Sequence, residues 1–391
     1  MRKWSLLAGL LLVAFTVAFT AWPAAAQGQG SLAVVYDVGG RGDLSFNDMA
    51  AMGADRARRE LGVMVTEVES ATTADFLPNL RALARSRQHD VIVGIGFLIQ
   101  DALTTVAQEF PNQKFALIDG FVDAPNVLSI SFSDHEGSAL VGALAAMTTL
   151  EAGGDTVGIV LGIEIPILLR FEIGYRAGVR WAVDRYNELH GTNKQVRVLH
   201  TYTGAFDDPA RGKAATEAML AQGAHVVYAV AGGTGLGVFE AVEQAARAQG
   251  RDVGPPFAIG VDSAQDWIAP GFIPVSMVKR VDNGVFAAIE QALAGTFEGG
   301  VLQLNLAAGG VAASSLDMLD VFMDEAVAAG KMRPEERVAR LEGARAAREA
   351  VPPSAWEALN ELDQLIRSGD YEVPEALDRE TAEYWREVLS N

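Results

Sequence analysis

Short apolar runs alternate with amphipathic segments along most of the chain. Eight runs have the length of a β-strand: Leu32–Tyr36, Val91–Gly94, Phe115–Ile118, Val157–Leu161, Val196–His200, Val226–Val230, Phe257–Val261 and Ile273–Val278. Most segments between them carry apolar residues at helical spacing: Met49–Leu61, Phe76–Ser86, Leu98–Glu109, Ser138–Leu150, Glu172–Leu189, Pro209–Ala221 and Val238–Gln249. This alternation predicts parallel sheets that are covered by helices on both faces, a three-layer α/β architecture.

The length of 391 residues favours two such units over one very large sheet. We expect a first lobe built from residues 31–134 and 263–300, and a second lobe built from residues 135–262 and 301–330. Beyond these the sequence becomes charged and alanine-rich, and strand-like runs disappear. Residues 331–391 are therefore predicted to form a helical C-terminal extension that packs on one lobe.

The N-terminus has the pattern of a secretory signal peptide. Arg2 and Lys3 precede an apolar stretch from Leu6 to Ala21, and small residues follow up to Ala26. We expect cleavage to remove residues 1–26, although the same stretch could be a short membrane anchor. The chain contains no cysteine, so it lacks the residue that a lipid anchor modifies and cannot form disulfides. We expect a free, monomeric exported protein that is not a lipoprotein.

Charge excludes two classes of partner. The formal net charge is −19, and such an excess of acid repels nucleic-acid phosphates and anionic lipid head groups. Hydrophobic residues make up 50% of the chain, but no later segment is long and apolar enough to span a bilayer. The apolar residues are therefore expected to form a core.

The loop after the first apolar run is the first candidate for a binding site. Ligands of open α/β sheets bind beyond the carboxyl ends of the strands. The stretch from Asp37 to Asp48, DVGGRGDLSFND, contains Asp43, Ser45, Phe46 and Asn47. A purely structural explanation is available, because glycines permit tight turns and Ser45 or Asn47 can cap the next helix. It does not explain why Asp43 and Phe46 occur together, so we favour a binding role.

Other strand ends carry polar or aromatic residues as well. Asp119 and Asp262 end equivalent apolar runs in the two units, which indicates acceptors for sugar hydroxyls or ring N–H groups, although a single aspartate there often forms a turn. Phe97 follows another run and is either a ligand contact or an interdomain packing residue. Lys279 ends a further run, where a buried cation could pair with Asp262; a solvated helix end is the alternative.

The second unit contributes a glycine-rich turn and two phenylalanines. The glycines in AGGTGLGVFEA (Ala231–Ala241) do not have the spacing of a dinucleotide fingerprint. Gly232 and Gly233 would let the backbone approach a flat ligand closely. Phe171 opens a helix and by itself resembles a core residue, whereas Phe206 precedes helix-capping residues and is the better candidate for an exposed ring.

Catalytic motifs are missing from the sequence. The five histidines are scattered without metal-ligand spacing, and the serine-nucleophile and phosphate-binding glycine motifs do not occur. The sequence therefore lacks the residues that a serine hydrolase, a kinase or a zinc enzyme needs. Paired carboxylates still allow a glycosidase, because their separation in space cannot be read from the sequence. We predict no catalytic residue, no cofactor and no metal.

Taken together, several segments resemble one known family. DVGGRGDLSFND, FALIDG, EGSALVGALAA, GYRAGV, AGGTGLGVFEA, GVDS and SMVKRVD have the order and spacing of the basic membrane protein family, which comprises purine-nucleoside-binding proteins of ABC transporters. The resemblance extends from Leu32 to about Val311, and IRSGDYEVP near the end resembles that family's closing segment. It implies a type I periplasmic-binding fold, in which two α/β lobes joined by a multi-segment hinge close on a ligand.

The resemblance also implies roles for the candidate residues. Asp43, Ser45, Phe46, Asn47 and Asp119 would line the cleft from the first lobe. Phe206, Gly232 and Gly233 would face the base from the second lobe, and Asp262 and Lys279 would lie near the ribose; the predicted set is completed by Phe97 and Phe171.

The implied partners are a purine nucleoside and a membrane permease, and the implied location is the periplasm. The missing lipid-anchor cysteine and the long C-terminal region depart from the family. The alternatives are the same fold with a free base, a flavin-like ring or a sugar, a sensor, or a secreted nucleoside hydrolase.

Overall fold

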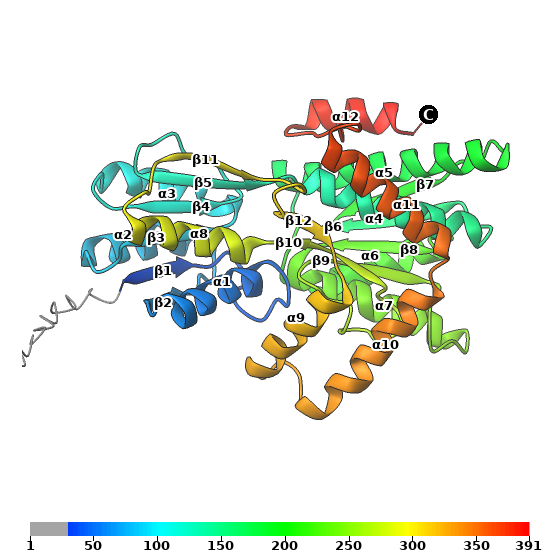
Figure 1. The fold of residues 1–391 in the computed structure, drawn as a ribbon, viewed down its shortest axis with the longest axis horizontal. Helices are drawn as coiled ribbons and strands as arrows, with labels where there is room; N and C mark the ends of the chain where they lie inside the picture. The colour runs from blue at the N-terminus through cyan, green and yellow to red at the C-terminus, as the bar shows by residue number, and fades with distance from the viewer. Residues whose placement is uncertain (1–29, 391) are drawn as a thin grey trace, which may run out of the picture.

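The computed structural model describes residues 30–390, which form two α/β lobes side by side (Figure 1). The predicted signal peptide lies outside the described residues. The first lobe has a six-stranded parallel sheet with the order β11-β5-β4-β3-β1-β2. Its strands are β1 (Ser31–Val35), β2 (Met64–Val68), β3 (Val91–Ile95), β4 (Phe115–Ile118), β5 (Val127–Phe132) and β11 (Gly300–Leu304).

Helices cover both faces of this sheet. On one face lie α1 (Phe46–Glu60) and α8 (Val281–Ala294), and on the other lie α2 (Phe76–Ser86) and α3 (Gln100–Glu109). Successive side chains of β1 point to opposite faces, so Val34 belongs to the core beneath α1 and Val35 to the core beneath α2 and α3. Burial on both faces explains why the central strands are continuous apolar runs.

The second lobe repeats this arrangement. Its sheet has the order β12-β10-β9-β8-β6-β7, and only the pairing of β12 with β10 is antiparallel among the described pairings. The strands are β6 (Thr156–Leu161), β7 (Arg197–Tyr202), β8 (Val226–Val230), β9 (Phe257–Asp262), β10 (Val275–Lys279) and β12 (Val311–Ala313). One face carries α4 (Asp134–Glu151) and α5 (Pro166–His190), and the other carries α6 (Pro209–Ala221) and α7 (Gly235–Ala248).

Small residues let α4 and α5 pack closely. A Cβ atom at Gly178 of α5 would lie 1.9 Å from the carbonyl oxygen of Ala139 in α4, so a larger residue would force the helices apart.

The chain crosses between the lobes three times: from β5 to α4, from β10 to α8, and from β11 to β12. The sequence-based division needs correction here. It assigned residues 263–300 to the first lobe, but β10 pairs with β9 in the second sheet, so the chain crosses only after Lys279. It assigned residues 301–330 to the second lobe, but β11 (Gly300–Leu304) pairs with β5 in the first sheet.

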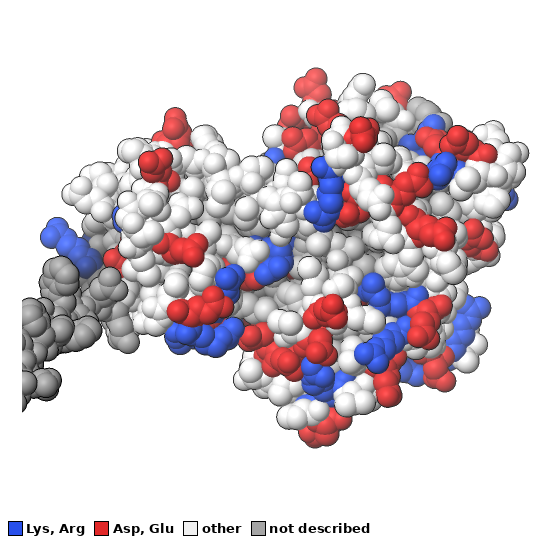
Figure 2. All heavy atoms as spheres, viewed as in Figure 1, with Lys and Arg blue, Asp and Glu red and all other residues white. Residues whose placement is uncertain are grey.

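The C-terminal part is helical and runs mainly along the second lobe (Figure 1). It comprises α9 (Leu316–Ala328), α10 (Arg337–Ala350), α11 (Pro353–Ser368) and α12 (Arg379–Val388), with α11 packed on α4 and α12 on α5. Figure 2 shows acidic and basic side chains interspersed over α9 and α10, as in the ion pairs of Arg337 with Asp320 and Asp324. No helix within residues 30–390 is both long and apolar enough to cross a membrane.

Candidate functional site

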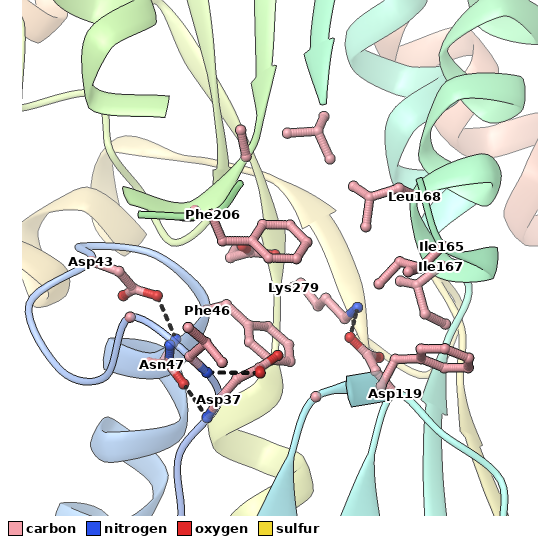
Figure 3. A pocket seen from close by; sticks show the side chains of 18 of the residues that line it. Asp37, Asp43, Phe46, Asn47, Asp119, Ile165, Ile167, Leu168, Phe206 and Lys279 are labelled. Atoms are coloured by element: carbon pink, nitrogen blue, oxygen red, sulfur yellow. Dashed lines mark hydrogen bonds and ion pairs between the residues drawn. The ribbon is translucent and has the colours of Figure 1, made fainter. Parts of the chain in front are cut away.

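A cavity lies between the lobes where the carboxyl ends of both sheets meet (Figure 3); the empty space here, including solvent at its open side, is about 660 Å³. Ten of the twelve predicted site residues line it: Asp43, Phe46, Asn47, Phe97, Asp119, Phe171, Phe206, Gly232, Asp262 and Lys279. Ser45 and Gly233 do not line it. Ligands of open α/β sheets bind beyond the carboxyl ends of the strands, and here the loops that follow the strands of both lobes surround one cavity.

Asp43 organises the loop that enters α1. Its carboxylate accepts hydrogen bonds from the backbone N–H groups of Ser45, Asn47 and Asp48 at 2.9, 2.9 and 3.1 Å. Ser45 occupies the N-cap position but makes no side-chain capping bond, so the aspartate, rather than Ser45 or Asn47, satisfies the free N–H groups of the helix. Asn47 accepts a bond from the backbone N–H of Asp37 at 3.1 Å and fixes the start of the loop.

Ser45 joins the two lobes instead of facing the cavity. Its hydroxyl donates to Asp262 Oδ2 at 2.7 Å. Nearby, the side chains of Ser263 and Gln265 donate to the carbonyl oxygen of Leu44 at 2.7 and 2.9 Å. Gly233 also lies at this junction, where an added Cβ would approach Asp43 Cβ to 3.9 Å. The lobes are therefore in direct contact along one side of the cavity.

Asp119 and Asp262 occupy equivalent places in the two lobes, at the ends of β4 and β9. Both have φ of +63°, a left-handed conformation that is unfavourable for residues other than glycine. Such local strain clusters at binding sites. The backbone turns both carboxyl groups toward the shared cavity, as the sequence pattern suggested.

Lys279 ends β10 and is buried between the lobes. Its Nζ lies 2.5 Å from Asp119 Oδ2 and 2.9 Å from Asp134 Oδ1, so these two residues are its ion-pair partners. The sequence had suggested Asp262 as the partner, and this prediction is wrong. The ammonium group also lies 5.1–5.5 Å from the centroids of three rings, those of Phe46, Phe132 and Phe171. Attraction between a cation and aromatic faces adds to the ion pairs.

Two aromatic rings from different lobes border the cavity on opposite sides. Figure 3 shows Phe46 at the start of α1 and Phe206 in the loop before α6, with open space between them. Phe206 packs against Gly162, the residue that follows β6, because a Cβ atom there would lie 2.2 Å from the Phe206 ring. Gly232 has φ of +55° and brings its backbone to the cavity wall.

Burial of the carboxyl groups changes their proton affinity. Loss of water raises the pKa of Asp37 and Asp262 to about 7 and that of Asp43 and Asp134 to about 6. Burial by itself lowers the pKa of Lys279, but the surrounding aspartates raise it by more, so the lysine stays charged. The cavity therefore combines one charged ammonium group with three carboxyl groups, those of Asp37, Asp43 and Asp262, whose pKa is raised to about 6 or 7.

The sequence analysis missed several cavity residues. Asp37 directly follows the first apolar run, Leu32–Tyr36, so the rule that found Asp119 would have found it. Asp134 does not line the cavity but is the second ion-pair partner of Lys279; it opens α4 just after a lobe crossing, and its residue type alone gave no signal. The remaining cavity residues that were missed are small or apolar: Val38, Gly39, Gly96, Ile165, Ile167, Leu168, Val230 and Ala231. In a sequence these resemble ordinary turn and core residues.

Comparison with known proteins agrees with this geometry. The family model of PnrA-like ABC transporter substrate-binding proteins matches residues 31–332. A solute-binding protein of an ABC transporter system from Aeropyrum pernix K1 has 40% sequence identity and a TM-score of 0.84, over 92% of this chain and 97% of its own. The nucleoside-binding protein BmpA of a Lactococcus lactis ABC transporter is 31% identical over 71% of this chain and 80% of its own.

A relative from Pyrococcus horikoshii extends farther along the chain. It is 40% identical over 89% of this chain and 85% of its own, and it is described as an uncharacterized lipoprotein. That description conflicts with the expectation of a protein without a lipid anchor, which rests on the absence of cysteine from this sequence. The match over residues 31–332, the two-lobed fold and the identity to the Aeropyrum and Pyrococcus proteins agree with one another. The chain belongs to the PnrA-like family of ABC transporter substrate-binding proteins, and the resemblance inferred from its motifs is confirmed.

Proposed function

We propose that this protein binds a purine nucleoside in the interlobe cavity and presents it to the membrane permease of an ABC importer. One observation carries the proposal: Phe46 and Phe206, from different lobes, border a single cavity whose charged lining is mostly carboxyl groups. The name of the Lactococcus relative, a nucleoside-binding protein, supports the same ligand class.

The chemistry of a nucleoside fits this lining. A purine has flat apolar faces, and each base–aromatic stacking contact is worth about 1–3 kcal/mol. Ribose hydroxyls and ring N–H groups are donors, which carboxylates accept. Within residues 30–390, Asp119 Oδ1 is buried without a hydrogen-bond partner, so a ligand hydroxyl could donate to it.

The charge balance favours a nucleoside over a nucleotide. Among the described residues that border the cavity, four are aspartates and one is a lysine, which is already paired with Asp119 and Asp134. A phosphate group in the cavity would lie near an excess of carboxyl groups and would have no free cation as a partner, which is unfavourable for a buried charge. The protein is expected to release its ligand chemically unchanged.

A melting screen with nucleosides, free bases, sugars and nucleotides tests the proposal. Inosine, guanosine or adenosine should stabilise the protein by about 2.7 kcal/mol at a hundredfold excess over Kd, and the corresponding monophosphates should stabilise it less. The nucleoside should be recovered intact by chromatography. Stabilisation by sugars or flavins alone would contradict the proposal, and a nucleoside recovered as base and ribose would identify a hydrolase.

Asp262→Ala should weaken the binding of ribosides more than that of free bases. Hydrogen bonds to charged groups contribute about 1.5–3 kcal/mol, so titration calorimetry should show about a 10- to 150-fold loss for inosine and a smaller loss for hypoxanthine. Asp252→Ala, at an exposed position of the same lobe, is the matched control. Equal losses for riboside and base would show that Asp262 contacts the base or only supports the loop through Ser45.

Nucleoside affinity should fall as the pH is lowered. Ligand hydroxyls donate to the ionised carboxylate, whereas burial holds the pKa of Asp37 and Asp262 at about 7 in the free protein. Below that pH a proton must leave before the ligand binds, so each linked carboxyl group weakens binding about tenfold per pH unit. Calorimetry between pH 8 and pH 5 should show a loss of about 100-fold for each carboxyl group that is linked to binding. A constant Kd would mean that neither carboxylate accepts a bond from the ligand.

A further inference from the structure

A second hollow adjoins the interlobe cavity. Phe97, Asp119 and Ile167 border both spaces, so the two hollows adjoin at these side chains. The second hollow, here called the side chamber, is open to solvent, and its empty space together with the solvent at its mouth is about 790 Å³. Its outer wall is formed by Phe121 and Val301 of the first lobe and by Leu377 of the segment between α11 and α12.

These three outer-wall side chains are unusually exposed for their type. Phe121, Val301 and Leu377 expose 57%, 59% and 49% of their surface. A single exposed apolar residue is ordinary, but three that converge on one hollow indicate a surface that binds an apolar group. All three stand on separate segments of the chain, so their convergence is a property of the folded protein.

The polar groups of the side chamber are largely engaged by the protein itself. Arg170 forms an ion pair with Glu375 at 3.0 Å and donates to Ser131 at 3.1 Å. Gln100 accepts a hydrogen bond from the backbone N–H of Phe121 at 2.9 Å. A charged group that entered the chamber would therefore find its counterion already paired, whereas an apolar group would bury the exposed side chains.

We propose that the side chamber is a subsite for an uncharged, apolar substituent of the bound nucleoside. The inference rests on the proposed function and extends it, because it makes substituted purine nucleosides the preferred ligands. The shared border at Phe97, Asp119 and Ile167 places the chamber next to the proposed ligand, so a substituent of that ligand is the occupant we propose. Each methylene group buried there should strengthen binding about fourfold.

The test compares adenosine with two substituted forms, N6-benzyladenosine and 5′-deoxy-5′-methylthioadenosine, which direct an apolar group from opposite ends of the nucleoside. Titration calorimetry of the intact protein should show that one of them binds at least tenfold tighter than adenosine. Val301→Asp and Phe121→Asp should each remove this gain and change the Kd for adenosine by less than threefold. Val321→Asp is the matched control, because Val321 is 57% exposed on α9 and does not line the chamber.

Three results would overturn the inference, and they differ from one another. If adenosine binds but both substituted forms bind no tighter, the chamber is not a subsite. If the aspartate variants weaken adenosine and the substituted forms equally, the exposed side chains serve lobe closure. If no nucleoside binds to the wild-type protein, the proposed function itself fails and the subsite fails with it.

Discussion

Replacing Lys279 with methionine is expected to lower the free energy of unfolding by about 3–5 kcal/mol. The ammonium group is 1% exposed and holds Asp119 and Asp134 together at 2.5 and 2.9 Å. Its removal leaves two buried carboxyl groups without a counterion, and breaking a buried ion pair in this way is strongly destabilising. Urea denaturation followed by circular dichroism measures the loss.

Two further variants make this prediction sharp. Lys213→Met removes a lysine from an exposed ion pair with Glu240 and should leave the free energy of unfolding almost unchanged. Adding Asp119→Asn and Asp134→Asn to Lys279→Met should recover most of the lost stability, which also provides a readout if the single variant does not fold. A single variant as stable as the wild type, or a triple variant no more stable than the single one, would contradict the account of the buried cluster.

Removing the rings of Phe46 and Phe206 should produce the largest losses of ligand affinity. Each alanine substitution deletes one stacking surface, worth about 1–3 kcal/mol, so the Kd for inosine should rise about 5- to 150-fold in each variant and further in the double variant. Both side chains are only partly buried. The variants should therefore remain folded, which a melting curve without ligand would show.

The matched control for these variants is Phe110→Ala. Phe110 is also partly buried but follows α3 in the first lobe, away from the cavity. The Phe110→Ala variant should lose stability to a similar extent as the Phe46→Ala and Phe206→Ala variants, and it should keep its affinity for inosine. If Phe46→Ala and Phe206→Ala both bind inosine as the wild type does, the assignment of the two rings to the ligand is wrong.

The sequence predicted those parts of the fold in which burial is symmetrical. β4 and β8 are buried on both faces, so their apolar runs are continuous, and their predicted bounds agree with the structure to the residue. β2 and β11 lie at the edges of the first sheet and expose much of their surface. Their polar residues break the apolar pattern, so neither strand was predicted, and the missed β11 led to the wrong lobe boundary at residue 301.

The site residues that lie at the ends of strands could be predicted from the sequence. Residues just after the strands could be named without knowing the fold, and this found Asp119, Asp262 and Lys279 at the cavity. The partner of Lys279 could not be predicted in this way. Asp134 reaches the lysine only because the chain crosses from β5 into α4 beside the end of β10, which is a property of the three-dimensional arrangement.

The C-terminal extension contacts α5, a helix that also contributes a residue to the cavity wall. Arg386 of α12 donates two hydrogen bonds to Glu172 of α5, at 2.9 and 2.6 Å. Burial raises the pKa of Glu172, but Arg386 and Arg176 outweigh this effect and lower it to about 2. Phe171, the preceding residue of α5, lines the cavity. The extension thus braces a helix whose other face borders the candidate ligand site, although the family match ends at residue 332.

The most direct measurement is a crystal structure of the protein grown with inosine. The account predicts electron density for the nucleoside between the lobes, with the purine ring between Phe46 and Phe206 and ribose hydroxyls within hydrogen-bond distance of Asp119 or Asp262. A nucleoside bound elsewhere on the molecule, or an interlobe cavity that holds only water at saturating inosine, would contradict it.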